Sequence, residues 1–381
     1  MIVAESKLAG VSESIFATMS ALANQYQAIN LAQGFPDFSC STELIELVHK
    51  YMKEGKNQYA PMPGVLQLRE RIAEKTLALQ HVSYNPDAEI CVTPGATAAI
   101  YAVIAALIIP GDEVVVIEPA YDSYIPVIEL HGGKAVCVPL LYPDYAIDWE
   151  LLEASINEKT KLLIINTPHN PSGMVWQYDD MKKLELLLQE TNVFLLSDEV
   201  YEHIIFDQNH HHSAASFPGL AERSFVISSF GKTYHNTGWK IGYCLAPAHL
   251  MTLFKQVYQF MVFSVNTPIQ FALAEFMEHK ENYLSLASFY QQKRDYFNSL
   301  ITNTKWRKFP CAGSYFQLLG YEAISDKSDI DFARQLTTEY KLASIPISVF
   351  YQNKLDQKVL RFCFAKEAAT LEKAAAILNR I

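Results

Sequence analysis

The chain has 381 residues, of which 50% are hydrophobic and 19% are charged, enough to bury the core of one large and one smaller domain. Its formal net charge is −10 and it contains no run of basic residues, which argues against nucleic acid as a partner. The longest apolar run, residues 98–109, is too short to cross a bilayer, and the first residues lack the pattern of a secretory signal. We therefore expect a soluble cytoplasmic protein that makes no contact with membranes.

The cysteines and histidines give no sign of a structural metal or of disulfide bonds. The six cysteines are single and widely spaced, so we expect buried, reduced thiols: Cys40, Cys91, Cys137, Cys244, Cys311 and Cys363. The run His210-His211-His212 allows a metal interpretation, but no cysteine or carboxylate pattern accompanies it. We expect no metal.

The N-terminal third begins with helical patterns. Residues 15–23 have helical spacing within an N-terminal arm, and residues 44–52 predict a helix with Thr42 as its cap. Between them, Gly34 precedes Phe-Pro, which indicates a backbone that bends or approaches another group closely. Residues 65–79 form an amphipathic helical pattern.

The middle of the chain alternates short apolar runs with helical patterns. The expected strands are residues 90–93, 114–117, 135–138, 162–165, 193–196, 225–227 and 241–245. The expected helices are residues 98–109, 149–157 (capped by Asp148) and 178–190. Continuous apolar strands separated by helices predict an α/β fold with a largely parallel sheet between helices, in which ligands bind at the carboxyl ends of the strands.

The C-terminal part predicts a smaller α/β domain. We expect helices at residues 247–263 and 329–340, a long linking helix over 268–302, a last helix at 366–380, and strands at 315–319, 343–345 and 359–364. The resulting division is an N-terminal arm with part of the small domain (1–43), a large domain (44–285) and a small C-terminal domain (286–381).

Lys232 is the first candidate catalytic residue. It follows the apolar run 225–227, in a turn rich in Ser, Gly and Thr. Burial at the end of a strand lowers the pKa of a lysine and makes its amine able to form a Schiff base. An ordinary surface lysine is the alternative, and the other strand ends decide between the two.

Those strand ends supply the partners that pyridoxal phosphate needs. Asp198 ends a buried strand, where a carboxylate is costly unless it holds a cation such as a protonated pyridine nitrogen, although a structural role is also open. Tyr201 and Asn170 are able to hydrogen-bond the phenolic oxygen of the cofactor, and Tyr121 to stack on its ring.

A phosphate site and a carboxylate site complete the set. Strand, small-residue turn and helix follow one another at Gly95-Ala96-Thr97, which presents free N–H groups to an anion, and Ser229 and Lys240 flank Lys232. Arg361 interrupts the apolar strand 359–364, and its fork-shaped donor suits a substrate α-carboxylate.

Taken together, these motifs resemble the class I and II pyridoxal phosphate aminotransferases of fold type I. Within them the chain is similar to the kynurenine/glutamine aminotransferase branch and to bacterial methionine aminotransferases. The matching stretches span the chain: residues 30–38, 57–62, 166–173, 197–201, 228–243, 263–268 and 361–366.

The resemblance implies a role for each candidate. Lys232 would carry the Schiff base, Asp198 would pair with the pyridine nitrogen, and Tyr201 and Asn170 would bind the phenolic oxygen. The remaining roles are ring stacking by Tyr121, phosphate binding by Gly95, Ala96, Thr97, Ser229 and Lys240, and carboxylate binding by Gly34, Asn170 and Arg361. Tyr59 would reach the phosphate of the other subunit, so the resemblance implies a homodimer with shared sites, in which Phe16, Tyr59 and Phe263 favour an apolar substrate.

The implied reaction is ping-pong transamination from an apolar or aromatic L-amino acid (methionine, phenylalanine or tyrosine, with kynurenine as a further candidate) to a 2-oxo acid. The chain has Lys240 where many relatives have arginine, which keeps the positive charge but loses the fork. Mammalian kynurenine aminotransferases have a tryptophan near Phe16 and a histidine near Ser264, and these two differences disfavour kynurenine as the main substrate. Three alternatives stay open: a C–S β-lyase acting on cysteine conjugates with the same residues, a non-catalytic sensor domain of a transcriptional regulator, and a nicotinamide-dependent dehydrogenase. The acidic composition disfavours the second, and the absence of a GxGxxG motif after the first strand disfavours the third.

Overall fold

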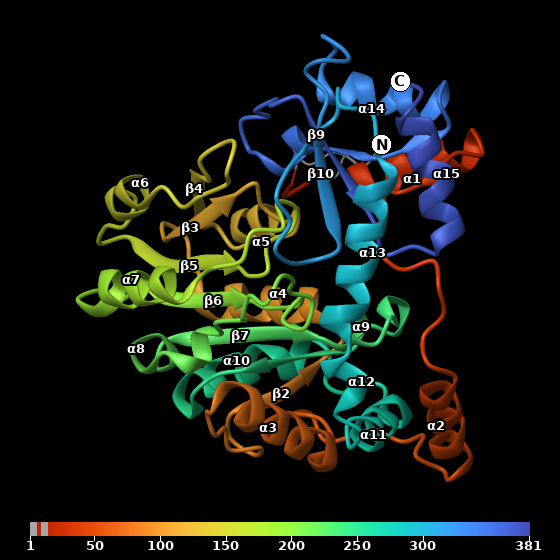
Figure 1. The fold of residues 1–381 in the computed structure, drawn as a ribbon. Coiled ribbons are helices and arrows are strands. Elements are labelled where there is room, and N and C mark those ends of the chain that lie inside the picture. Colours follow the sequence, from red (N-terminus) through yellow and green to blue (C-terminus); the bar gives the residue numbers. More distant parts are fainter. Residues whose placement is uncertain (1–5, 9–13) are drawn as a thin grey trace, which may run out of the picture.

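A seven-stranded sheet forms the centre of the protein (Figure 1) in a computed structural model that describes residues 6–8 and 14–381. Its strand order is β2-β8-β7-β6-β5-β3-β4. The strands are β2 (Ile90–Thr93), β3 (Glu113–Glu118), β4 (Lys134–Pro139), β5 (Thr160–Asn166), β6 (Phe194–Asp198), β7 (Ser224–Ser229) and β8 (Gly242–Leu245). Only β8 runs against its neighbours in this sheet, which confirms the predicted α/β fold with a mostly parallel sheet.

Helices pack on this sheet because its strands are apolar on both faces. Helices α4 (Ala96–Leu107) and α10 (Ala248–Met261) contact each other, α4 contacts β7 and β8, and α10 contacts β2. Further helices are α3 (Leu66–Gln80), α5 (Tyr124–Leu130), α6 (Trp149–Ala154), α7 (Tyr178–Gln189), α8 (Pro218–Ala221) and α9 (Phe230–Thr233). The central residues of β3, β5 and β6 are fully buried, as continuous apolar strands require.

The parallel strands deliver polar residues to one edge of the sheet. Asn166 ends β5 and is the register partner of Asp198, which ends β6, and Ser229 ends the neighbouring strand β7. Since parallel strands end on the same side, the functional side chains gather there.

A second group of elements joins the two ends of the chain (Figure 1). Strand β1 (Ile29–Asn30) pairs with β11 (Leu342–Ala343) in a two-stranded sheet. A four-stranded sheet has the order β12 (Ile345–Pro346), β13 (Val359–Cys363), β10 (Phe316–Gly320) and β9 (Arg307–Lys308). Helices α1 (Ile15–Gln25), α14 (Asp329–Thr338) and α15 (Ala368–Leu378) accompany these strands. The division at residues 43 and 285 stays a prediction.

The predicted long helix over residues 268–302 is wrong. The segment forms α11 (Thr267–Phe276), α12 (Glu281–Leu284) and α13 (Leu286–Leu300). The Asn282 side chain donates to the carbonyl oxygen of Phe276 at 3.0 Å and so satisfies the end of α11. Tyr283 and Leu286, which lie in the segments after α11, are also buried, so the apolar periodicity continues across the helix breaks. For this reason the sequence pattern did not indicate the breaks.

Smaller corrections concern caps, short elements and thiols. Helix α2 (Thr42–Lys53) is capped by Ser41, whose side chain accepts from the Leu44 N–H group, and not by Thr42. Helix α5 was not predicted, and the predicted strand 343–345 divides between β11 and β12. All six cysteines are free, but Cys40 and Cys137 are partly exposed and not buried as expected. Across the described residues, the structure contains no helix with the length and apolarity needed to span a membrane.

Candidate active site

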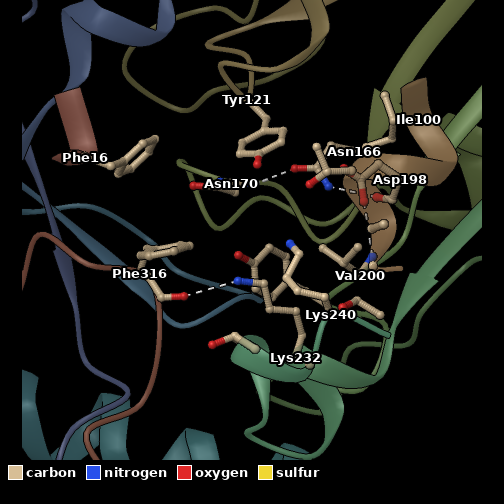
Figure 2. Close-up of a pocket in the computed structure, with 18 of the residues that line it drawn as sticks. Phe16, Ile100, Tyr121, Asn166, Asn170, Asp198, Val200, Lys232, Lys240 and Phe316 are labelled. Carbon is tan, nitrogen blue, oxygen red and sulfur yellow. Dashed lines mark hydrogen bonds between the residues drawn. The ribbon is translucent and has the colours of Figure 1, made fainter. Parts of the chain in front are cut away.

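A cavity of about 230 Å³ opens at the carboxyl edge of the sheet (Figure 2). Of the predicted site residues it is lined by Phe16, Gly34, Gly95, Ala96, Thr97, Tyr121, Asn170, Asp198, Tyr201, Ser229, Lys232, Lys240 and Arg361. Figure 2 shows Lys232 and Lys240 entering from one side, with Asn166 and Asp198 opposite them. The fold thus brings together residues from 16 to 361 in a single site.

Lys232 lies in α9, a single turn that follows β7 directly. Its Nζ donates to the carbonyl oxygen of Gly34 at 3.1 Å and to the hydroxyl of Tyr315 at 2.9 Å. Burial, helped by the positive charges of Arg361 and Lys240, lowers the pKa of Lys232 to about 8. About a tenth of this amine is therefore neutral at pH 7, far more than for an ordinary lysine, and the neutral form is the one that acts as a nucleophile or base.

Asp198 is held rigidly at the end of β6. The Tyr124 hydroxyl donates to Oδ2 at 2.5 Å, and the Val200 N–H group donates to Oδ1 at 3.4 Å. The Asn166 side chain donates to the Asp198 carbonyl oxygen at 2.8 Å, which fixes the strand end. Burial raises the pKa of Asp198 to about 6, although Tyr124 and Lys232 favour its charged form. A cation bound against this carboxylate would remove much of that cost.

Arg361 is a buried cation without an anion. Its side chain is 1% exposed, Nη1 donates to Asn170 Oδ1 at 2.7 Å, and Nη2 donates to the Ala32 carbonyl oxygen at 3.1 Å. Among the described residues neither of these acceptors is a carboxylate, Nε has no hydrogen-bond partner, and Asp122 acts on the guanidinium only by charge. Burial lowers the pKa of Arg361 to about 10, and its guanidinium carbon lies 3.9 Å from the centre of the Phe316 ring. The site therefore has a place for an anion such as a carboxylate.

A second anion site forms where α4 begins. Gly95 precedes the helix with a φ of 83° and no side chain caps its first N–H groups. A Cβ atom on Gly95 would lie 3.4 Å from Lys240 Nζ, so the glycine keeps this corner open beside a positive charge. A Cβ on Gly242 would lie 2.6 Å from the Ser228 carbonyl oxygen, so glycine is also required where β8 begins to pair with β7. Free helix N–H groups, a lysine and the Ser229 hydroxyl suit a phosphate.

Two predicted residues lie outside the cavity of the single chain. Tyr59 is 82% exposed and Phe263 is 56% exposed, and their rings contact each other edge to face with centroids 5.3 Å apart. Tyr59 was expected to act on another subunit, and Phe263 beside it points to the same surface.

Several residues of the site were not predicted from the sequence. Tyr124 and Tyr315 hydrogen-bond Asp198 and Lys232, and the unpredicted residues that line the cavity are Asn166, Phe316, Val200, Ile100, Gly231, Thr237 and Ile241. Asn166 had the signal that identified Asp198, a polar side chain at the end of an apolar strand. The three aromatic residues stand in apolar surroundings and look like core, which they also are.

The histidine run takes no part in the site. His211 Nε2 lies 2.6 Å from Glu199 Oε2, and within residues 6–8 and 14–381 no group of three or more potential ligands is arranged to hold a metal ion.

Comparison with known proteins agrees with this geometry. The family described as aminotransferase class I and II matches residues 26–378. A methionine aminotransferase of Escherichia coli K12 is 46% identical over 381 residues, covering 100% of this chain and 99% of its own. A kynurenine–oxoglutarate transaminase of Dictyostelium discoideum is 34% identical over 401 residues, covering 95% of this chain and 92% of its own. A crystal structure of an Escherichia coli protein, reported to identify a methionine aminotransferase function, has a TM-score of 0.97 at 46% identity and covers 100% of both chains.

A mostly parallel sheet with a lysine and a carboxylate at its carboxyl edge, facing an arginine from β13 of the smaller sheet, is the arrangement of a fold type I transferase. The chain belongs to the aminotransferase class I and II family and is an aminotransferase. These relatives give no support to the C–S lyase alternative.

Proposed function

We propose that the protein is a pyridoxal 5′-phosphate-dependent aminotransferase that moves the amino group of an apolar or aromatic L-amino acid to a 2-oxo acid by a ping-pong reaction. The observation that carries this proposal is one cavity holding three buried groups with shifted pKa values: Lys232, Asp198 and the unpaired Arg361. Each lacks a partner that the cofactor or the substrate would supply.

The residues present fit the cofactor. Lys232 would bind its aldehyde, Asp198 its protonated pyridine nitrogen, and Tyr201 and Asn170 its phenolic oxygen, with Tyr121 against the ring. The N–H groups of Ala96 and Thr97, with Ser229 and Lys240, would bind its phosphate. When bound, the cofactor supplies an electron sink for the pair of electrons left at the substrate Cα.

The protein's own groups would bind the substrate and move one proton. Arg361 and Asn170, with the Gly34 backbone, would hold the α-carboxylate and so orient the Cα–H bond. The neutral Lys232 amine would accept the Cα proton and later return it, since its lowered pKa suits both steps near neutral pH.

An apolar side-chain site supports donors such as methionine, phenylalanine and tyrosine. Phe16, Phe316 and Val200 line the cavity. Its cations within residues 6–8 and 14–381 are Lys232, Lys240 and Arg361, and each already has a task, so none of these described cations is left to bind a second carboxylate. Methionine and phenylalanine are the preferred donors in this proposal, and kynurenine is a weaker candidate.

The active assembly in this proposal is a homodimer. Exposed Tyr59 and Phe263 of one subunit would complete the site of the other. The acidic composition supports a soluble enzyme that acts on small molecules, and we propose the cytoplasm as its location.

A donor screen combined with Lys232→Ala tests the proposal. Methionine and phenylalanine are expected to be converted far faster than aspartate with several 2-oxo acids, and Lys232→Ala is expected to abolish turnover, while the surface change Lys305→Ala leaves it intact. Near-normal turnover by Lys232→Ala would overturn the assignment, and equal rates with aspartate and methionine would overturn the apolar donor preference.

A further inference from the structure

The Lys232 amine is held by a closed set of three hydrogen bonds. Lys232 Nζ donates to the Tyr315 hydroxyl at 2.9 Å and to the Gly34 carbonyl oxygen at 3.1 Å, and the Tyr315 hydroxyl donates to the same carbonyl oxygen at 2.6 Å. We propose that Tyr315, together with the Gly34 carbonyl, is the positioning residue that holds the free Lys232 amine and directs its lone pair into the cavity. This inference rests on the proposed role of Lys232 as the proton carrier.

The direction of each hydrogen bond follows from counting protons. A tyrosine hydroxyl has one proton, and here it goes to Gly34, so the Tyr315 oxygen is an acceptor toward Lys232. Burial raises the pKa of Tyr315 well above its usual value, so the hydroxyl stays protonated at working pH. A neutral amine has two N–H groups and one lone pair, and the two acceptors occupy both N–H groups. The lone pair then points away from them.

The two acceptors are themselves fixed. The Tyr315 ring packs against Tyr201, Tyr290 and Phe316 with centroids 5.1, 5.7 and 4.9 Å away, and its side chain is fully buried. A Cβ atom on Gly34 would lie 2.9 Å from the Phe316 ring, so only glycine brings this carbonyl oxygen so close. The free Lys232 amine therefore finds two acceptors that are already in place, and little free energy is needed to rearrange them when the amine is freed from the cofactor.

Other groups near Lys232 act by charge and not by contact. Arg361 and Lys240 lower its pKa, whereas Cys363 and Asp198 raise it, and among the described residues none of the four makes a hydrogen bond to Nζ. The Nζ atom also lies 5.5 Å from the centre of the Tyr201 ring. Orientation of the amine thus depends on Tyr315 and Gly34.

Tyr315→Phe tests the proposal because it removes one oxygen and keeps the packed ring. The matched control is Tyr290→Phe, since Tyr290 contacts the Tyr315 ring but its hydroxyl has no hydrogen-bond partner among the described residues. In the cofactor-free protein, the pH dependence of Lys232 modification by an amine reagent, followed by mass spectrometry, measures its pKa. Tyr315→Phe is expected to lower that pKa, because an acceptor that favours the charged amine is lost.

The loaded enzyme provides a second readout. With Cα-deuterated methionine, Tyr315→Phe is expected to lower kcat about tenfold, to raise the deuterium isotope effect on kcat, and to change KM less than about twofold. Tyr290→Phe is expected to match the wild type in both measurements.

If Tyr315→Phe leaves both the pKa of Lys232 and the isotope effect unchanged, this proposal is overturned. That holds even if the loss of turnover in Lys232→Ala confirms that Lys232 is needed for transamination. The two proposals fail separately. If the wild-type protein does not transaminate, the proposed function is overturned. If Tyr315→Phe nevertheless lowers the pKa of Lys232, the positioning role of Tyr315 is still supported.

Discussion

Lys232 and Asp198 share one feature: each is a buried ionisable group at or just after the end of a strand, and the two strands are neighbours. Strands β6 and β7 are paired, so the two groups face the same cavity. Burial moves the pKa of Lys232 down to about 8 and the pKa of Asp198 up to about 6, each toward the neutral form. Burying these two charged groups therefore costs free energy in the cofactor-free protein, and a bound cofactor would offset that cost.

That cost predicts a pH-dependent stability of the cofactor-free protein. The folded-state pKa of Asp198 lies above its unfolded value, so between about pH 4 and about pH 6 the native state binds more protons. Its contribution to the free energy of unfolding is present below this range and is lost as the pH rises through it, by on the order of 2–3 kcal/mol. The difference in unfolding free energy between wild type and Asp198→Asn, measured by urea titration, is expected to change by this amount between pH 4 and 7. A difference that is constant with pH would contradict the burial argument.

Arg361→Lys tests the carboxylate site. Lysine keeps the charge but loses the two-pronged geometry and the contact with Asn170. We expect KM for methionine to rise about 10- to 100-fold with a smaller change in kcat, measured by steady-state kinetics. Arg307→Lys, on the surface, serves as the control. A KM within about twofold of wild type would rule out this binding role.

At this scale the sequence predicted the polar residues better than the aromatic ones. Asp198, Lys232 and Arg361 stand out because charges rarely occur in or after apolar strands. Tyr124 and Tyr315 do not stand out, because a buried tyrosine is ordinary and its partner is far away in sequence: 74 residues separate Tyr124 from Asp198, and 83 separate Lys232 from Tyr315.

At the scale of elements, the start of α4 depends on how closely β8 approaches it. A Cβ atom on Gly242 would lie 2.6 Å from the Ser228 carbonyl oxygen and 3.0 Å from the Ala96 nitrogen, both of them backbone atoms that cannot move aside cheaply. This contact aligns the free N–H groups of α4 with Ser229 and Lys240. The proposed phosphate site is thus a product of strand and helix placement.

Gly242→Ala is expected to disturb this corner. We expect a loss of about 1–3 kcal/mol in stability, measured by urea unfolding, and weaker binding of inorganic phosphate to the cofactor-free protein, measured by calorimetry. The control is Gly238→Ala, four residues earlier in the short 3-10 helix Thr237–Trp239, where an added Cβ meets nothing within 4 Å. Equal stability and equal phosphate binding in the two variants would show that the close approach of Gly242 to Ser228 and Ala96 does not shape the phosphate site.

Strands were easier to predict than helix breaks. Apolar runs of β-branched residues located each central strand to within a few residues, because burial on both faces demands them. The breaks between α11, α12 and α13 escaped prediction because a side-chain cap from Asn282, and not a proline or glycine, ends α11.

At the scale of the whole molecule, three aromatic side chains are strongly exposed, two of which, Tyr59 and Phe263, contact each other. Phe260 is 88% exposed, Tyr59 is 82% exposed and Phe263 is 56% exposed. Large exposed aromatic side chains favour an interface, and a second copy of the chain would cover them. No single-chain pattern in the sequence reports such a contact, so only the resemblance to the family indicated it.

Mixed dimers test whether the sites are shared. Lys232→Ala and Tyr59→Ala are each expected to be strongly impaired alone. After unfolding and refolding together in equal amounts, half of the dimers are mixed, and each mixed dimer has one intact site, so about a quarter of wild-type activity is expected to return. No recovery above the sum of the separate variants would show that Tyr59 does not act across the interface.

We propose that Lys232, and not Lys240, binds the cofactor covalently, while Lys240 binds the phosphate. Reduction of the loaded enzyme with borohydride fixes the carbon–nitrogen bond between lysine and cofactor, and peptide mass spectrometry then locates it. The pyridoxyl group is expected on Lys232 alone, and it is expected to be lost from that position when methionine is added before reduction. A pyridoxyl group on Lys240, or none on Lys232, would show that the two lysines do not have these roles.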